Sequence, residues 1–558
     1  MLIGLDMGGT HTDAVLISGG EVIRHVKVLT DPADFLASVR EALDTLLEGR
    51  DPATVRRINL STTVCTNAIV EGKTEPVGLL LEPGPGLNPS FLACAKVNVF
   101  LQGSIDHRGR ETGSLKVGEL EAAKEQFAAA GIRCLAAVGK FSVRNPAHEL
   151  EIAKRLEGSY DFITLGHRLS GRLAFPRRVY TAYLNSSVWR VYSRFAEAVR
   201  SYGKSRGLKI EPFILKADGG TLTLSGAMNT PVETILSGPA ASIMGALALA
   251  PGEDDCVILD VGGTTTDIAF CAGGVPLFEP QGIRLGPYPT LVRSFFVHSI
   301  GLGGDSSVRI ADRRMAIGPQ RQGPPVALGG PAPTPTDAFI ALGMLPVGDR
   351  GLAVEAIEGL GRSLGLSVRA TAHSILDELA AGIAGAVGRL LNYLNSRPVY
   401  TIREVLTERK LEPRRVIAVG APAPLLKPFL EKALGLPVEV PSLAGVANAV
   451  GAALSHPTAT LAVFADTERG VLTAPEIGWQ ERIGRSFSLD DARQRAFALL
   501  ERRLRELGYT EGTPEIEVIE EQSFNMVRGF YTVGRNIRLK VQNRPSLGGL
   551  KGGGNCHA

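Results

Sequence analysis

One short motif occurs twice in this chain, and the duplication constrains the fold more than any other feature of the sequence. Residues 6–13 read Asp-Met-Gly-Gly-Thr-His-Thr-Asp, and residues 260–267 read Asp-Val-Gly-Gly-Thr-Thr-Thr-Asp. Apolar runs lie on both sides of each copy, which predicts two strands joined by a tight turn with glycines at its tip. Two such β-hairpins, separated by about half of the chain, indicate a duplicated domain.

The residue types in this motif suit a phosphate group. Glycine lets backbone N–H groups approach an anion closely, and threonine hydroxyls place further donors beside them. The first aspartate of each copy, Asp6 or Asp260, stands at the end of a strand, where a carboxylate can hold Mg²⁺. The duplication therefore predicts a nucleotide held between two halves, and the alternative is a pair of ordinary Gly-rich hairpins.

Composition excludes several other classes of protein. A chain of 558 residues predicts three or four domains, and 44% hydrophobic with 21% charged residues is typical of a soluble globular protein. The 60 Lys and Arg against 57 Asp and Glu give a net charge of +3, which favours neither nucleic acid nor an anionic membrane. No apolar run approaches the roughly 20 residues of a membrane span. The chain begins directly in an apolar strand, and its six scattered cysteines lack a CxxC pair, so we expect a cytoplasmic protein.

The order of predicted elements divides the chain into three parts. Strands and helices alternate over residues 1–174, which predicts a largely parallel sheet. A long predicted helix at 175–207 leads into a second part that contains the second hairpin and ends near residue 458. The remainder, residues 459–558, reads as a small α+β region, and its tail from Ser546 onward is so rich in glycine that we expect it not to order itself.

The two hairpins and a later strand, glycine turn and helix at 416–434 resemble the actin, Hsp70 and sugar-kinase ATPase superfamily. In that superfamily the hairpins are the phosphate motifs and the third element is the adenosine motif. A set of segments in this order is similar to the hydantoinase A/5-oxoprolinase family: Gly4–Asp13, Ser61–Asn67, Asn145–Glu149, Asp218–Gly220, Thr234–Ala240, Asp260–Asp267 and Gly301–Ser306. The resemblance covers roughly residues 1–458.

The resemblance implies a two-lobed, actin-like (ribonuclease-H-like) α/β fold with duplicated phosphate hairpins and a small α+β C-terminal region. It places an N-terminal lobe at 1–174, an ATPase lobe at 175–458 and the C-terminal region at 459–558. The family includes ATP-dependent ring-opening amidohydrolases and a subunit of acetone-type carboxylases. It therefore implies ATP, Mg²⁺, a small cyclic amide or related carbonyl substrate, and a separate B-type partner subunit. A homo-oligomer stays open.

In the resembling fold, Asp6 and Asp260 face each other across a cleft and hold Mg²⁺, and together with Thr10 they form the predicted catalytic set. The alternative for both aspartates is a cap on the hairpin. The residues expected to bind the nucleotide are Gly8, Gly9, Thr10, His11, Thr12, Gly262, Gly263, Thr264, Thr265, Thr266, Gly303, Gly304, Asp305, Gly420 and Ala421. His11 either donates to a phosphate or packs against its own hairpin.

A second predicted set of residues binds the substrate. Thr62, Thr63 and Asn67 belong to a polar segment after the short strand at 58–60, which we expect to be a loop. Asn145 and Asp218 also stand near predicted strand ends, and the carboxyl ends of strands carry the ligands in open α/β sheets. The alternatives are a helix cap for Asn145 and a turn for Asp218.

These expectations favour an ATP-dependent amidohydrolase subunit that phosphorylates a cyclic amide to activate it for hydrolysis. Two other classes stay open: a small-molecule kinase or carboxylase-like ATP-using subunit, and an ATP-driven switch that resembles actin or Hsp70. The polar segments 61–67 and 145–149 favour a small ligand over a switch. The cysteines lack the spacing of an iron–sulfur site.

Overall fold

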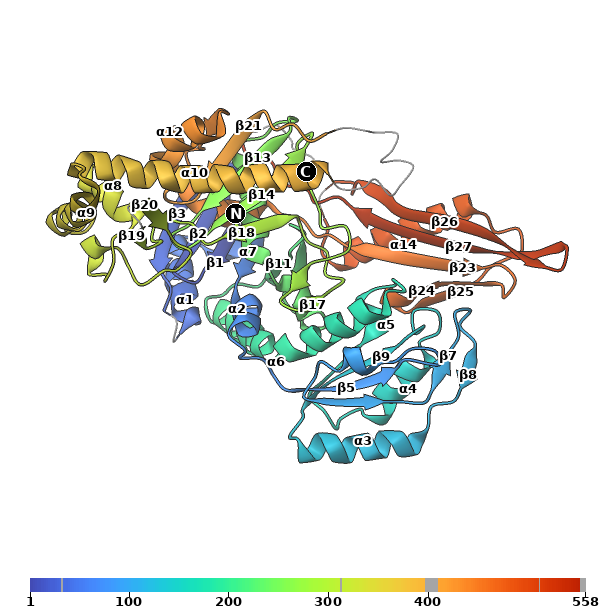
Figure 1. Ribbon diagram of the computed structural model, residues 1–558. Helices are drawn as coiled ribbons and strands as arrows, with labels where there is room; N and C mark the ends of the chain where they lie inside the picture. Colours follow the sequence, from blue (N-terminus) through green and yellow to red (C-terminus); the bar gives the residue numbers. More distant parts are fainter. Residues whose placement is uncertain (32–33, 312–313, 397–409, 511, 552–558) are drawn as a thin grey trace.

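The computed structural model describes all residues except 32–33, 312–313, 397–409, 511 and 552–558 (Figure 1). Its first lobe is built on a six-stranded sheet in the order β12-β11-β4-β1-β2-β3. The strands are β1 (Leu2–Met7), β2 (His11–Ser18), β3 (Glu21–Leu29), β4 (Arg57–Thr62), β11 (Phe213–Leu215) and β12 (Thr221–Thr223). In the hairpin Asp6 lies opposite Asp13, and β4 runs parallel to β1.

The second lobe repeats this plan. Its sheet has the order β15-β14-β13-β21-β22, and β18 pairs with β14. Its strands are β13 (Cys256–Val261), β14 (Thr266–Ala272), β15 (Val275–Pro276), β18 (Val297–Ile300), β21 (Arg415–Val419) and β22 (Val438–Glu439). Asp260 lies opposite Asp267 in the hairpin, and β21 runs parallel to β13, as β4 does to β1. The predicted duplication is therefore present in the fold.

Alternating strand residues place helices on both faces of each sheet. In the first lobe α1 (Phe35–Leu47) packs on one face and α13 (Ala447–Leu454) on the other. In the second lobe α7 (Ser237–Leu249) covers one face. The opposite face is covered by α8 (Pro335–Ala341), α10 (Val368–Asn395) and α12 (Ala423–Leu434), and α9 (Arg350–Leu364) packs beside α8 and α10.

Helices α7 and α13 join the two lobes. They pack so closely that a Cβ atom on Gly245 would lie 1.9 Å from the Ala447 carbonyl oxygen. On the other side of α13, a Cβ atom on Gly4 of β1 would lie 2.0 Å from the Ala449 carbonyl oxygen. The small residues in these segments therefore let two helix backbones and one strand meet at the centre of the molecule.

The prediction of one parallel sheet over residues 1–174 is wrong. Residues 77–165 form a separate parallel sheet, β10 (Phe162–Leu165), β9 (Cys134–Gly139), β5 (Val77–Glu82) and β6 (Val97–Phe100), with α3 (Val117–Ala129) and α4 (Ala147–Arg155). The first sheet is completed instead by β11 and β12. The sequence could not predict this, because local periodicity does not specify which strand pairs with which. Helix α6 (Phe175–Ser205) packs its first half on the four-stranded sheet and its second half on the first lobe (Figure 1).

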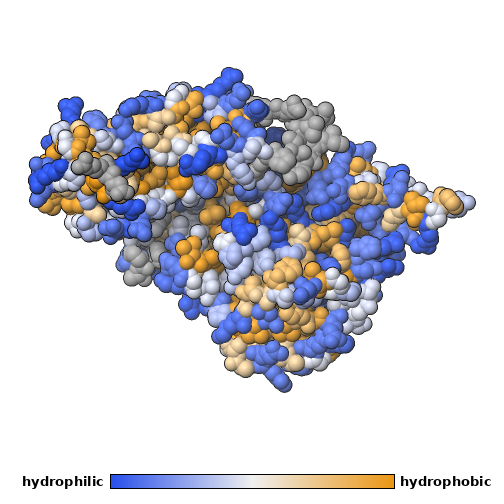
Figure 2. All heavy atoms as spheres, in the orientation of Figure 1, coloured by the Kyte–Doolittle hydropathy of each residue, from blue (hydrophilic) through white to orange (hydrophobic). Residues whose placement is uncertain are grey.

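The C-terminal region is α+β, as predicted. Its antiparallel sheet has the order β25-β24-β23-β27-β26. The elements are β23 (Thr460–Asp466), β24 (Val471–Ala474), β25 (Trp479–Arg482), α14 (Leu489–Glu506), β26 (Ile516–Arg528) and β27 (Tyr531–Asn543). Because β27 pairs with β23 only over 536–542, the outer part of the β26–β27 ribbon is two-stranded and extends away from the molecule (Figure 1). Apolar colour is visible at its tip (Figure 2), where Phe530 is fully exposed.

The tail departs from expectation up to Lys551. The Gly548 N–H donates to the Leu454 carbonyl oxygen at 2.8 Å, and the Lys551 N–H donates to the Gly20 carbonyl oxygen at 2.7 Å. Leu547 and Leu550 pack against the apolar cluster between β2 and α13. The two leucines and the hydrogen bonds to Leu454 and Gly20 thus order a segment that its glycines alone would leave unordered. Residues 552–558 lie outside the described residues.

The remaining elements are short. They are α2 (Val64–Val70), α5 (Gly166–Leu169), β7 (Ser104–Ile105), β8 (Glu111–Gly113), β16 (Arg284–Leu285), β17 (Tyr288–Pro289), β19 (Val308–Ala311) and β20 (Arg314–Ile317). No helix in the described part of the chain is both long and apolar enough to cross a membrane.

Candidate functional site

The tips of both motif hairpins are open to solvent and are built alike. The Gly8 N–H donates to the His11 carbonyl oxygen at 3.0 Å, and the Gly262 N–H donates to the Thr265 carbonyl oxygen at 2.9 Å. The exposed residues of the tips are Gly9, Thr10, Thr264 and Thr265. Their backbone and hydroxyl donors are therefore available to an anion from solvent, as a phosphate site requires.

The last threonine of each motif, Thr12 or Thr266, points into the protein and not to solvent. Thr12 is fully buried, and its hydroxyl lies 2.8 Å from that of Ser38 in helix α1. Thr266 is fully buried as well, and its hydroxyl donates to the Leu302 carbonyl oxygen at 2.6 Å. Both hydroxyls are engaged inside the protein because strand alternation turns them inward, so any contact of residues 12 and 266 with phosphate stays a prediction for their backbone N–H groups.

The two motif aspartates meet at a residue that the sequence analysis did not single out. Asn448 of helix α13 donates its side-chain amide to Asp6 Oδ2 at 3.0 Å, and the same side chain opposes the rise that burial causes in the pKa of Asp260. The Ser242 hydroxyl of helix α7 donates to Asp260 Oδ2. The helix pair between the lobes thus brings Asp6 and Asp260 near each other, and their role in holding Mg²⁺ stays a prediction.

Burial is the main cause of the raised pKa values of the four motif aspartates. Burial, together with the charges of Asp13 and Asp260, raises the pKa of Asp6 to about 6, although hydrogen bonds from Ser61 and Asn448 oppose the shift. Burial likewise raises the pKa of Asp13 and Asp260, and that of Asp267 to about 6. A nearby cation is Lys27, which pairs with Asp13 at 2.5 Å. The hairpins therefore hold mutually repelling carboxylates that a bound cation would stabilise.

These residues fit Mg²⁺. Asp6 Oδ1 is buried and has no hydrogen-bond partner among the described residues. Mg²⁺ is commonly held by one or two carboxylates together with water and phosphate oxygens, which is the set that Asp6, Asp260 and a nucleotide would offer. No cluster of three or more His, Cys, Asp or Glu side chains suited to a metal occurs in the described ranges. Water and phosphate would therefore supply the other ligands.

The loop at 301–306 lies directly on the second hairpin. The Gly304 N–H donates to the Gly262 carbonyl oxygen at 3.0 Å, and the Asp305 N–H donates to that of Gly263 at 2.6 Å. A Cβ atom on Gly303 would lie 2.6 Å from the Gly262 carbonyl oxygen, so only glycine fits there. These glycines serve the packing of the loop, whatever they also contribute to a ligand.

Two further predicted nucleotide residues lie beside this hairpin. Gly420 has a φ of +95°, and a Cβ atom on it would lie 2.2 Å from the Val261 carbonyl oxygen. Ala421 follows it as an exposed residue just before helix α12. Across from them, burial lowers the pKa of His11 and raises that of Asp305, and the charge of each group opposes the shift of the other. His11 therefore faces the second lobe as well as its own hairpin.

The segment 61–67 lies beside the first hairpin, but it is not a loop. Thr62 ends β4, and helix α2 begins at Val64. The Thr63 N–H and hydroxyl both donate to the Met7 carbonyl oxygen at 3.3 Å, and the Asn67 amide donates to Thr63 Oγ1 at 3.3 Å. The structure thus brings Thr62, Thr63 and Asn67 next to the end of β1.

Asn145 is engaged by protein groups at the start of helix α4. Its amide nitrogen donates to the Gly109 carbonyl oxygen at 3.0 Å, and its amide oxygen accepts from the Ala147 N–H at 3.1 Å. The second contact reaches Ala147, the first residue of helix α4, whose N-cap residue is Pro146. The same helix carries Glu149, which is buried against His167, and His148, whose Nδ1 lies 2.8 Å from Glu82 Oε1. Polar side chains of the same domain therefore supply these contacts, although His148 Nε2 is buried without a hydrogen-bond partner among the described residues.

Asp218 is also fully engaged by protein groups. It ion-pairs with Lys216 at 3.2 Å and Arg293 at 3.0 Å, and it accepts from the Thr458 hydroxyl at 2.9 Å. Burial opposes the charged form, but Lys216 and Arg293 outweigh it and lower the pKa of Asp218. Asp218 is therefore a permanent charge that organises its neighbours, and it lies at a cavity apart from the hairpin tips.

The sequence of the chain is similar to one family of known proteins. The sequence profile of the hydantoinase/oxoprolinase N-terminal region matches residues 2–159, and that of hydantoinase/oxoprolinase matches residues 178–461. The chain is 27% identical to caprolactamase subunit alpha of Pseudomonas jessenii over 460 residues, which is 75% of this chain and 64% of that protein. It is 26% identical to the acetophenone carboxylase gamma subunit of Aromatoleum aromaticum, over 62% of this chain and 53% of that one.

A third relative is 5-oxoprolinase 1 of Arabidopsis thaliana, which is 24% identical over 81% of this chain and 41% of that protein. The chain therefore spans between 41% and 64% of the length of these three relatives. Among solved structures, the ATP-dependent caprolactamase of Pseudomonas jessenii superimposes with a TM-score of 0.73 at 23% identity, covering 97% of this chain and 87% of that one. Nucleotide-free acetone carboxylase gives a TM-score of 0.69 at 17% identity, with the same two coverages. Both support the actin-like ATPase fold.

Proposed function

The chain belongs to the hydantoinase/oxoprolinase family, and on this premise we propose that it is an ATP-using subunit that activates a small cyclic amide for hydrolysis. The observation that carries the proposal is the meeting of Asp6 and Asp260 at Asn448, directly below two open hairpin tips. In this arrangement Asp6 and Asp260 would hold Mg²⁺, which when bound neutralises phosphate charge. Thr10, Thr264 and Thr265 would donate to the phosphate oxygens.

The chemical reason for using ATP lies in the substrate. An unstrained amide hydrolyses slowly because its carbonyl carbon is a weak electrophile and its nitrogen is a poor leaving group. Transfer of the γ-phosphoryl group to the amide oxygen, with release of ADP, makes that carbon electrophilic. Water then adds to the carbon, and the carbon–nitrogen bond breaks with proton transfer to nitrogen, which leaves an acyl phosphate. A second water hydrolyses this acyl phosphate to the carboxylate and inorganic phosphate. The tasks left to the protein are positioning and charge stabilisation.

Helix α2 supports a place for the substrate. Thr63 is tied to the carbonyl oxygen of Met7, the residue after Asp6, so the start of α2 lies beside the proposed phosphate site. Asn67 is half-buried one turn further along the same helix. In the proposal Thr63 and Asn67 hydrogen-bond the cyclic amide on the first-lobe side of the γ-phosphate.

Two relatives are named as subunits, which supports the proposal that this chain works with a partner subunit. Caprolactamase subunit alpha and the acetophenone carboxylase gamma subunit are both subunits of larger enzymes. We therefore propose that a B-type subunit completes the hydrolysis. The acetophenone carboxylase relationship keeps a second function open, in which the same site activates a carbonyl oxygen for carboxylation.

The test is release of ADP from Mg-ATP in the presence of 5-oxoproline, hydantoins, simple lactams or ketones, with and without the protein encoded by the neighbouring gene. The proposal expects a cyclic amide to stimulate ADP release and to be opened to the amino acid. Stimulation by ketone and bicarbonate alone would move the assignment to a carboxylase. ATP hydrolysis that is indifferent to every compound would favour a switch protein.

A further inference from the structure

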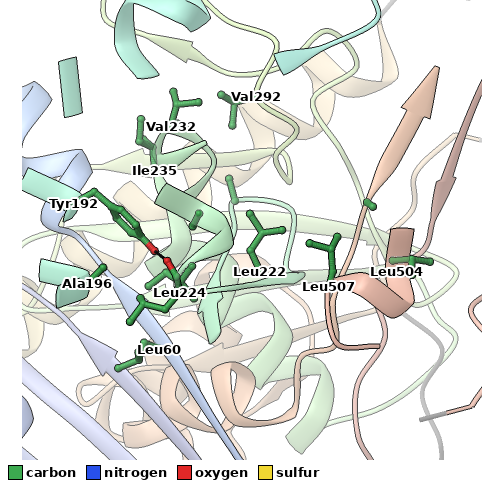
Figure 3. Close-up of a cluster of buried hydrophobic side chains, with 14 of the residues drawn as sticks. Leu60, Tyr192, Ala196, Leu222, Leu224, Val232, Ile235, Val292, Leu504 and Leu507 are labelled. Atoms are coloured by element: carbon green, nitrogen blue, oxygen red, sulfur yellow. Dashed lines mark hydrogen bonds between the residues drawn. The ribbon is translucent and has the colours of Figure 1, made fainter. Parts of the chain in front are cut away.

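A cavity of about 400 Å³ lies where the first lobe, the loop at 291–293 and the C-terminal region meet. Part of its wall is apolar. Figure 3 shows Val232 and Val292 on one side of this region, and Leu222 and Leu507 on the other. This volume suits a small organic molecule, and it is formed by segments that lie hundreds of residues apart in the sequence.

Three charged side chains that line the cavity keep unused hydrogen-bonding groups. Arg293 Nη2 and Glu476 Oε2 are buried and have no hydrogen-bond partner in the described part of the chain. Lys540 on β27 makes no hydrogen bond or ion pair with any described residue, and burial lowers its pKa to about 8. The two buried atoms, Arg293 Nη2 and Glu476 Oε2, cost free energy unless something satisfies them, so each indicates a missing partner. The half-buried ammonium of Lys540 lines the same cavity.

The other polar atoms of Arg293 and Glu476 are held by hydrogen bonds within the protein. Arg293 Nη1 donates to Asp218 Oδ2 at 3.0 Å, and its guanidinium stacks on Phe278 with 4.4 Å between its central carbon and the ring centre. Glu476 Oε1 accepts from the Gly171 N–H at 2.7 Å and from the Ala462 N–H at 3.2 Å. Both side chains are therefore fixed before any ligand arrives, and each presents one free polar end.

We propose that this cavity binds a small molecule that carries both a carboxylate and an N–H donor. The carboxylate would lie between Arg293 Nη2 and the Lys540 ammonium, whose charges repel each other in the cavity and are balanced by an anion. The N–H would donate to Glu476 Oε2, and the carbon skeleton would contact the apolar wall. Two sources share this chemistry: a free amino acid, and a cyclic amide that bears a carboxylate.

This site is separate from the hairpin tips. Asp218, which anchors Arg293, follows β11, and β11 is divided from β1 by β4. Two strand spacings correspond to about 10 Å. The cavity and Asp6 therefore both lie at the carboxyl ends of the strands, but Asp6 does not line the cavity. The inference goes beyond the proposed function, because recognition by Arg293, Glu476 and Lys540 does not require turnover of ATP.

Calorimetric titration of the full chain with four probes tests both halves of the recognition. Glutamate has a carboxylate and an amine, 5-oxoproline has a carboxylate and an amide N–H, glutarate lacks nitrogen, and 2-pyrrolidone lacks the carboxylate. We expect glutamate or 5-oxoproline to bind at least tenfold more tightly than either glutarate or 2-pyrrolidone. The tighter of the first two identifies the source. Equal binding of all four, or binding of none, would overturn the proposal.

Variants then locate the binding. Lys540→Met should weaken the tighter probe at least tenfold, and Glu476→Gln should weaken that probe more than it weakens glutarate. Arg538→Met is the matched control, because Arg538 stands two residues away on the same strand, pairs with Glu520 at 3.2 Å and does not line the cavity. Circular dichroism checks folding. A loss as large in Arg538→Met as in Lys540→Met would show an effect of general charge and contradict the assignment.

Discussion

Asn448 donates to Asp6 Oδ2 at 3.0 Å, which ties helix α13 to the end of strand β1 across 442 residues of sequence. Helix α7 makes the equivalent contact to the other lobe through Ser242 and Asp260. Because the two helices are in close backbone contact at Gly245, displacement of either helix moves the carboxylates of the site. The geometry of the candidate site is therefore set between the lobes rather than within one of them.

Replacing Asn448 with Ala should show this coupling. The change removes a half-buried donor from Asp6, so we expect the free energy of unfolding to fall by about 1–3 kcal/mol and the affinity for Mg-ATP to fall with it. Urea unfolding and calorimetry measure the two effects, with Asn525→Ala on the exposed face of β26 as control. A variant that matched the wild type in both would contradict the coupling.

Asp260→Asn should separate metal binding from folding. Asp260 is held among carboxylates that repel it, so removing its charge should leave the thermal stability of the metal-free protein at pH 7 unchanged or higher. Binding of Mg-ATP should nevertheless be lost or strongly weakened, because a ligand of the cation is gone. The matched control is Asp254→Asn, an exposed aspartate before the same strand. If folded wild-type protein bound no nucleotide in calorimetry, the central proposal would fail.

Stability of the metal-free protein should depend on pH in a defined direction. Burial raises the pKa of Asp6 and Asp267 from 3.8 to about 6, so the folded state binds more protons than the unfolded state between these values. Their contribution is fully present below about pH 4 and is lost as the pH rises through about 6, by up to about 3 kcal/mol for each carboxyl group.

Urea unfolding at pH 5 and pH 7 in the presence of a chelator checks this dependence. Asp6→Asn combined with Asp267→Asn should flatten it, and Mg-ATP should stabilise the wild type more at pH 7 than at pH 5. A double variant with the pH dependence of the wild type would show that other groups control it.

Asn67→Ala tests the proposed substrate position. Loss of one buried hydrogen bond to a substrate should cost about 1–3 kcal/mol, which corresponds to roughly 5- to 150-fold in the substrate concentration needed for half-maximal ADP release. The affinity for ATP should stay nearly unchanged. Glu71→Ala, at the exposed end of the same helix, serves as control. Loss of ATP affinity with intact substrate dependence would assign α2 to the nucleotide instead.

Leu547→Ala tests the ordered part of the tail. Leu547 packs against the cluster that contains Val15 and Val450, so we expect the free energy of unfolding to fall by about 1–2 kcal/mol. Ending the chain at Pro545 should destabilise it further, since the hydrogen bonds to Leu454 and Gly20 would also be lost. Leu328→Ala is the control, because that side chain is 53% exposed. Equal melting temperatures for Leu547→Ala and wild type would show that the tail contributes nothing.

The sequence predicted the two hairpins and most helices because their signals are local. Paired glycines between apolar runs specify the turns at 8–9 and 262–263, and the apolar periodicity of 372–394 specifies a helix. Asn448 carries no such signal. It is a single polar residue in a helix of small residues, and its importance comes from the packing of α13 against β1 and α7.

Other departures share this origin. Alternation along β2 decides that the Thr12 hydroxyl points inward, which requires knowing where the strand begins. Thr-rich composition suggested a loop at 61–67, but contact of Thr63 with Met7 and of Thr66 with Leu236 favours a helix there. Strands β11 and β12 are three residues each, too short for any periodicity to assign them to the first sheet.

The composition of the first sheet has a consequence for synthesis of the chain. Strands β1 and β2 emerge from the ribosome at once, whereas β11 follows about two hundred residues later and α13, which covers Val15 and Ile17, more than four hundred residues later. Until then an open strand edge and an apolar face of the nascent lobe lack their partners, which favours aggregation. The face of this lobe that contains Val15 and Ile17 thus stays uncovered until α13 has been made, and a nascent chain stalled before residue 447 should require a chaperone to stay soluble.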